Sequence, residues 1–96
     1  MTELPIDISR LETASLEFPH GDVLSRKAER KKRAKRIHSA TYVGNIRQEK
    51  VNIVFQTESH VFKVQTTIWL HYGGAIYLKG DITIPVERVI SVDWIQ

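Results

Sequence analysis

The chain has 96 residues, of which 42% are hydrophobic and none is cysteine, and its net charge is +3. This length suits one small domain, the hydrophobic share excludes a chain that is disordered by composition, and the lack of cysteine excludes disulfides and thiolate metal sites. No apolar run approaches the roughly 20 residues that span a bilayer, and the N-terminus opens with an acid, so we expect a soluble cytoplasmic protein.

The positive charge is concentrated in one segment. Residues 1–22 contain five acidic residues and one arginine, residues 23–40 contain eight basic residues and one acid, and residues 41–96 contain five of each sign. A partner attracted by charge would therefore meet the segment 23–40 first.

Residues 1–21 are predicted to form an extended N-terminal arm. Ile6 and Ile8, and later Leu16 and Phe18, alternate in the way that strand residues do, although prolines interrupt the pattern. We expect this arm to wrap around the core.

A basic helix is predicted over residues 22–44, which are rich in the helix formers Lys, Arg, Glu and Ala. Asp22 or Ser25 can cap its start, and Gly44 and Asn45 predict a left-handed stop. When residues are placed at intervals of 100°, the arginines and the lysines of this helix fall on opposite halves.

The two halves predict a division of roles. The arginine half continues into Ala34, Ile37 and Ala40, which we expect to dock on the core, and the acidic arm could supply carboxylates to the arginines. The lysine half contains no acid, and its like charges repel one another at a spacing of four residues, so a polyanion would stabilise it.

We therefore predict that RNA or DNA contacts the helix through lysine side chains, with the arginines orienting the helix or adding charge. The predicted contact residues are Lys27, Lys31, Lys32, Lys35, Arg26, Arg30, Arg33 and Arg36. The ordinary alternative is a solvated helix face. A membrane surface is disfavoured, because Leu24 is the only large apolar residue in the N-terminal half of the helix.

The segment 45–96 is predicted to be a five-stranded β-barrel. Strand patterns separated by tight turns occupy residues 50–56, 61–70, 75–80, 82–85 and 89–94. Because five short strands cannot bury both faces of an open sheet, curling into a small barrel would give them one core. The whole chain is thus expected to be one mainly β domain with an N-terminal helix.

An aromatic pair on the second predicted strand is another candidate interaction surface. A three-residue turn at residues 72–74 pairs Leu70 with Ile76 and leaves Trp69 opposite Tyr77 on the other side of the sheet. Such a pair could stack nucleic-acid bases, although it is more often covered by a helix, an arm or a second copy of the chain.

The stretch TTIWLHYGGAIYLKGDITIPVERVISV, residues 66–92, resembles short uncharacterised bacterial proteins that share a TTIW strand and an IP…RI ending. The resemblance covers roughly residues 34–93 and implies an SH3-like or Sm-like small barrel with no assigned activity. Bacterial Sm-like RNA chaperones, which bind uridine-rich RNA as rings, have a similar strand plan and a tyrosine-lysine-histidine signature in the last turn. Here Val86, Glu87 and Arg88 stand in those positions, so the resemblance does not extend to the uridine pocket.

No catalytic motif is present in the sequence. The histidines do not form an H-x-x-x-H or H-E-x-x-H pattern, and there is no nucleophile elbow or phosphate-binding glycine loop. We therefore expect a non-enzymatic binding module without a metal, a cofactor or a small-molecule substrate. The alternative is a protein-interaction or self-assembling module that uses a barrel edge or the Trp69 and Tyr77 face, with the basic helix solvated or paired with an acidic arm.

Overall fold

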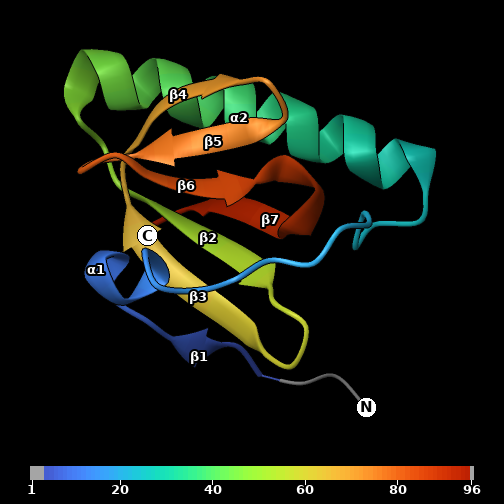
Figure 1. Ribbon diagram of the computed structural model, residues 1–96. Helices are drawn as coiled ribbons and strands as arrows, with labels where there is room; N and C mark the ends of the chain where they lie inside the picture. The colour runs from blue at the N-terminus through green and yellow to red at the C-terminus, as the bar shows by residue number, and fades with distance from the viewer. Residues whose placement is uncertain (1–3, 96) are drawn as a thin grey trace.

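The computed structural model describes residues 4–95, which form two β-sheets, one long helix and one short helix (Figure 1). In chain order the elements are β1 (Ile6–Asp7), α1 (Arg10–Thr13), α2 (Lys27–Arg47), β2 (Val51–Gln56), β3 (Val61–Thr66), β4 (Ile68–Tyr72), β5 (Ala75–Leu78), β6 (Ile82–Pro85), a 3-10 turn (Val86–Arg88) and β7 (Val89–Trp94). One sheet has the order β1-β3-β2-β7 and the other has the order β4-β5-β6. The prediction of a mainly β chain with one long helix is confirmed.

Strand β2 lies inside the larger sheet and follows the predicted alternation. Its residues Val51, Ile53 and Phe55 are fully buried, and the residues between them are partly exposed. β2 pairs antiparallel with β3 on one side and with β7 on the other. It therefore presents one apolar face to the core along its whole length.

The chain passes from one sheet to the other at Thr67, the single residue between β3 and β4. The residues Thr66, Thr67 and Ile68 are buried in succession, which breaks the two-residue alternation of an uninterrupted strand. The predicted strand 61–70 is therefore two strands that belong to different sheets. No ladder joins the two sheets within residues 4–95, so the predicted closure into a barrel is not confirmed.

One hydrophobic core is shared by both sheets and by α2. The helix contributes Ile37 and Ala40, the larger sheet contributes Phe55 among others, and the smaller sheet contributes Ile76 and Ile84. In Figure 1, α2 runs along one side of the molecule next to β4, and it contacts both β4 and β7. The helix thus covers the place where the two sheets meet.

Residues 4–21 of the predicted N-terminal arm pack along the core, and residues 1–3 lie outside the described range. β1 pairs in parallel with β3, and Ile8, Leu16 and Phe18 pack against the buried cluster. The arm also contains the short helix α1, which was not predicted. Its signal was the capping box in which the Ser9 hydroxyl accepts from the Glu12 amide and the Glu12 carboxylate accepts from the Ser9 amide.

Helix α2 begins and ends later than predicted. Its N-cap is Arg26, which makes no side-chain capping bond, and its C-cap is Gln48, which adopts the left-handed conformation with φ of 54°. Gly44 is not a stop, because it lies inside the helix and is buried. A Cβ atom at this position would collide with the Ile68 carbonyl oxygen and lie 3.0 Å from Thr67 Cγ2. Gly44 therefore allows the helix to approach β4 closely.

The buried face of α2 is also displaced from the predicted one. Ala34 is exposed, whereas Arg33 and Gly44 join Ile37 and Ala40 on the inner side. The four inner residues cluster within a narrow sector of the helix, and Ala34 lies outside it. No helix in the described part of the chain is long and apolar enough to cross a membrane.

Candidate functional site

The basic segment of α2 is divided between an inner arginine side and an outer lysine side. Arg33 is the innermost of these cations, with 6% of its side chain exposed. Its Nη1 donates to Asp22 Oδ1 at 2.8 Å and to the Val89 carbonyl at 3.0 Å, and its Nη2 donates to Asp22 Oδ2 at 2.7 Å. This two-pronged geometry suits the planar guanidinium and would not be reproduced by lysine.

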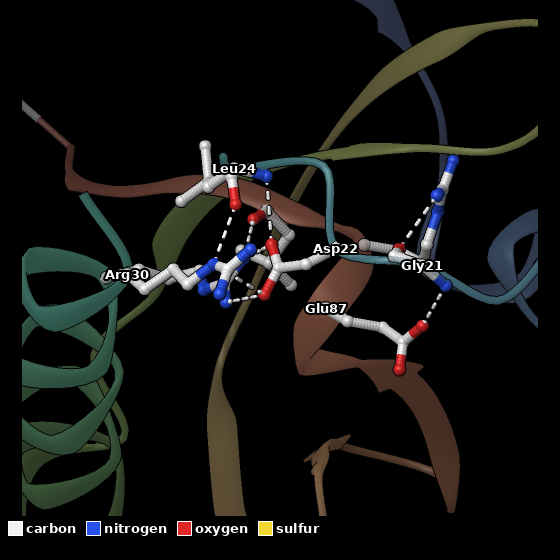
Figure 2. A network of polar contacts seen from close by, with 8 residues as sticks. Gly21, Asp22, Leu24, Arg30 and Glu87 are labelled. Atoms are coloured by element: carbon white, nitrogen blue, oxygen red, sulfur yellow. Dashed lines mark hydrogen bonds and ion pairs between the residues drawn. The ribbon is translucent and has the colours of Figure 1, made fainter. Parts of the chain in front are cut away.

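Asp22 is the centre of a polar network between the arm and the helix. Its Oδ1 also accepts from the Leu24 amide at 2.8 Å, and Arg30 Nε lies 3.5 Å from Oδ2 while donating to the Leu24 carbonyl at 2.7 Å. In Figure 2 the Asp22 carboxylate points toward the side chain of Arg30. The hydrogen bond from Arg33 holds the pKa of Asp22 below its ordinary value, against the opposing effect of burial, with smaller help from the Leu24 amide.

Arg36 extends the same pattern along β7, an edge strand of the larger sheet. Its Nη1 lies 3.4 Å from both the Val92 carbonyl and Asp93 Oδ1. Arg33 and Arg36 therefore both donate to carbonyl groups of β7, which satisfies acceptors of this edge strand and joins it to the helix. The carboxylates that meet the arginine half come from Asp22, directly after the arm, and from Asp93 on β7, whereas the division of the helix predicts a supply from the acidic N-terminal segment alone.

A second buried arginine, which sequence reasoning missed, holds the segment before α2. Arg88 donates to the carbonyl groups of Gln56 at 3.0 Å, Gly21 at 3.0 Å and Thr57 at 3.3 Å. The neighbouring Glu87 accepts from the Gly21 amide with its carboxylate (Figure 2). No sequence signal distinguishes Arg88 from an exposed arginine in a turn. It occupies one of the Sm signature positions, but its side chain has a structural role here.

The four lysines of the segment lie on the opposite side of α2. Lys27, Lys31, Lys32 and Lys35 are exposed, and none of them forms an ion pair or a side-chain hydrogen bond within residues 4–95. Arg26, at the N-cap, is exposed as well. The structure thus separates Arg33 and Arg36, which hold the helix in place, from lysines that remain available to an external anion.

The lysine side of the helix continues into two exposed apolar residues. Tyr42 is 64% exposed and Ile46 is 61% exposed, and both fall on the lysine half of the helix at 100° per residue. An exposed ring beside a row of cations is a feature of surfaces that bind single-stranded nucleic acid.

The predicted pairing of Trp69 with Tyr77 is wrong. The turn consists of Gly73 and Gly74, and β4 and β5 pair Leu70 with Tyr77 because the register shifts between Ile68 and Leu70. This bulge could not be read from the alternation of residues, and it displaces Trp69 from the ladder.

Tyr77 instead stacks on Tyr72, with ring centroids 5.7 Å apart and an angle of 15° between the planes. Tyr77 and Trp69 are both partly exposed, and Trp69 borders a separate pocket near α1. Trp69 and Tyr77, which were predicted to form one interaction surface, therefore make separate contacts.

The histidines do not form a metal centre in the part of the chain that the structure describes. His38 on α2 and His71 on β4 have ring centroids 5.8 Å apart, an edge-to-face contact between two elements far apart in sequence. No group of three or more His, Asp or Glu side chains suited to a metal ion occurs within residues 4–95. We therefore interpret the contact between His38 and His71 as packing of the helix against the smaller sheet.

Comparison of the chain with protein-family models, with curated proteins and with solved structures finds no match.

Proposed function

We propose that this protein is a non-enzymatic module that binds nucleic acid through the lysine side of α2. The observation that carries the proposal is the unequal use of the two kinds of cation in one segment. Arg33 and Arg36 are engaged by Asp22, Asp93 and β7 carbonyls, whereas the four lysines meet no carboxylate in the described chain. Unneutralised cations on one face attract a polyanion and release its counterions on binding.

The anchoring of α2 supports this function because it presents the lysines on a rigid support. The helix has 21 residues, about 31 Å at ~1.5 Å per residue. Its inner side is fixed by the Arg33 ion pair, by Ile37 and Ala40 in the core, and by the close approach of Gly44 to β4. Nucleic acid that meets the lysines would not have to order the helix, so binding would cost less conformational entropy.

Tyr42 adds a stacking surface on the same side of the helix. A base can stack on an exposed ring while neighbouring phosphates meet lysines, and this combination binds single strands with little sequence preference. The proposal therefore favours single-stranded RNA or DNA over a duplex. A cytoplasmic location, where such strands occur, is part of this proposal.

We also propose a more specific layout for the two sheets. We infer a partly open barrel of SH3-like or Sm-like layout, as in the bacterial proteins that residues 66–92 resemble. The direct passage from β3 to β4 at Thr67, the core shared by both sheets and the 3-10 turn between β6 and β7 support this interpretation.

The proposal is tested by two variants that remove equal charge. Lys31→Gln with Lys35→Gln alters the outer side of α2, and Arg47→Gln with Lys63→Gln removes two cations elsewhere. At ~50 mM salt the first variant should bind a mixed-sequence single strand at least about tenfold more weakly than the wild type, because each phosphate contact contributes roughly 1 kcal/mol. Equal loss in both variants would indicate attraction by net charge alone and would refute a specific lysine surface.

A protein-interaction module is the second candidate function. It is favoured by Leu70 and Tyr72 of β4, which are 47% and 66% exposed although they belong to a sheet. Exposed apolar residues on a strand are suited to covering by a second copy of the chain. Light scattering at high micromolar concentration tests it: a dimer that Leu70→Ser disrupts would support the second candidate, and a monomer would exclude self-association.

A further inference from the structure

A second basic site lies where the arm, the end of α2 and the junction of β3 with β4 meet. A pocket of about 500 Å³ is lined there by Ser9, Arg10, Leu11, Gln48, Lys50, Gln65, Thr66, Thr67, Trp69 and Lys79. This volume falls within the range of about 300 to 1,000 Å³ that small-molecule sites occupy. The cavity between α2 and β7, which Lys32, Arg33 and Arg36 help to line, is smaller, at about 240 Å³, and holds carboxylates as well as cations.

The lining of the larger pocket carries three positive charges and no negative one. Arg10, Lys50 and Lys79 come from three different parts of the chain, and none of them forms an ion pair or a side-chain hydrogen bond within the described range 4–95. The acids nearest in sequence to these cations, Glu12, Glu49 and Asp81, do not line the pocket, although the Glu12 carboxylate accepts from the amide of the lining residue Ser9. The carbonyl end of α2 adds a partial negative charge of roughly half an electron, which three full charges exceed.

Arg10 has a further unused donor. Its Nε atom is buried and has no hydrogen-bond partner among residues 4–95. The same is true of Arg33 Nε, whose guanidinium is already held by Asp22, so the buried Nε does not itself mark an anion site. What Arg10 offers the pocket is its charge and its terminal guanidinium nitrogens, because arginine binds phosphate through two parallel bonds.

The other walls of the pocket suit a nucleobase. Trp69 lines the pocket at the β4 bulge, where it has no partner in the ladder, and bulges commonly redirect a side chain toward a site. The side-chain amide of Gln48 offers a donor and an acceptor to a base edge, whereas Gln65 Nε2 already donates to Asn52 Oδ1 at 3.1 Å and leaves chiefly its carbonyl oxygen as an acceptor. Gln48 is the left-handed C-cap of α2, and its amide N–H donates to the Gly44 carbonyl, which fixes the backbone position of this residue at the edge of the pocket.

We propose that this pocket binds a nucleoside monophosphate unit, with the phosphate held by Arg10, Lys50 and Lys79 and the base placed against Trp69. The unit could be a free mononucleotide or the phosphorylated end of a strand, since both offer the same chemistry. The site is separate from the four lysines of α2, because the nearest of them, Lys35, lies 13 residues, about 20 Å along the helix, from Gln48. The proposal does not depend on nucleic acid binding at the lysines.

The test is titration of the full chain with adenosine 5′-monophosphate at ~50 mM salt, followed through the two tryptophan indole resonances by NMR. The Trp69 resonance should shift and that of Trp94, assigned with Trp94→Phe, should not. Lys50→Gln with Lys79→Gln should weaken binding about a hundredfold or more, since each of the two charged hydrogen bonds lost is worth about tenfold or more. Arg47→Gln with Lys63→Gln removes the same charge elsewhere and should keep the affinity within about twofold.

Three outcomes would overturn the proposal: no shift of Trp69 at millimolar nucleotide, equal loss in both double variants, or inorganic phosphate binding as tightly as the nucleotide. The source of the unit is decided with the variant in which Lys27, Lys31, Lys32 and Lys35 are all glutamine. If a 5′-phosphorylated tetranucleotide binds this variant more tightly than the mononucleotide does, and its 5′-hydroxyl form does not, the ligand is a strand end. If the mononucleotide binds equally well, it is the free nucleotide.

Discussion

The ion pair between Asp22 and Arg33 is predicted to hold the basic helix on the sheets, and Asp22→Asn tests this directly. The substitution keeps the size of the side chain but removes its charge. One of the two oxygen atoms that accept from Arg33 becomes an amide nitrogen, which cannot accept from a guanidinium. Arg33, with 6% of its side chain exposed, would then be a buried cation without its counterion.

The expected loss of stability can be bracketed from the structure. Losing one hydrogen bond to a charged group costs roughly 1.5 to 3 kcal/mol, and removing one partner of a fully buried ion pair costs roughly 3 to 5 kcal/mol. Asp22 has 21% of its side chain exposed, so water reduces the upper figure. We expect a decrease of about 3 kcal/mol in the free energy of unfolding, which lowers the melting temperature by about 12 °C or more for a domain of this size.

The assay is equilibrium unfolding in urea at pH 7, with Asp93→Asn as the matched control. Asp93 meets Arg36 through a single 3.4 Å contact, and 57% of its side chain is exposed, so its loss should cost less than about 0.5 kcal/mol. The double variant Asp22→Asn with Arg33→Met should recover part of the stability, because it removes the unpaired charge. If Asp22→Asn costs no more than Asp93→Asn, the ion pair does not anchor the helix.

Three further predictions concern the same framework. Because the pKa of Asp22 is lowered in the folded state, its contribution to the free energy of unfolding is complete above the unfolded pKa of about 4 and is lost as pH falls through the lower folded pKa. The stability difference between wild type and Asp22→Asn should therefore be constant from pH 8 to 5 and shrink below pH ~4. A difference that already shrinks between pH 7 and 5 would contradict this assignment. Gly44→Ala should destabilise the protein by about 1 to 2 kcal/mol in thermal unfolding, because the energy cost of overlap with the Ile68 carbonyl exceeds the gain in helix propensity. Ser39→Ala, at an exposed helical position, should be neutral or slightly stabilising. A stabilising Gly44→Ala would contradict the close approach of α2 to β4. Arg88→Met should lower the free energy of unfolding in urea by about 3 kcal/mol, because three carbonyl groups lose their donor. Arg47→Met, which alters an exposed residue, should change it little. Equal effects would show that the hydrogen bonds of Arg88, including the one to Gly21, do not stabilise the fold.

The parts of the fold that follow a regular period were predictable from the sequence. Val51, Ile53 and Phe55 alternate strictly and are buried, and the separation of arginines from lysines around the helix corresponds to its inner and outer sides. Both patterns depend on local geometry alone, which is why residue spacing is sufficient to detect them.

The features that were missed depend on contacts between distant segments. Burial of Thr66, Thr67 and Ile68 in succession and the bulge near Trp69 interrupt the period at a place that no residue type marks. Gly44 resembles a helix stop until the closeness of Ile68 is known, because glycine serves both purposes. The pocket around Trp69 likewise joins Arg10, Lys50 and Lys79 from separate segments, so spacing along the chain could not reveal it.

The central claim is tested most directly by the salt dependence of single-stranded RNA binding. If the lysines Lys27, Lys31, Lys32 and Lys35 contact phosphates, the logarithm of the binding constant should fall with the logarithm of salt concentration with a slope near −3, at about 0.7 per phosphate neutralised on a single strand. The variant in which all four are glutamine should bind far more weakly and with a nearly flat slope. Unchanged affinity in that variant, or a wild-type slope near zero, would contradict a nucleic-acid surface on this helix.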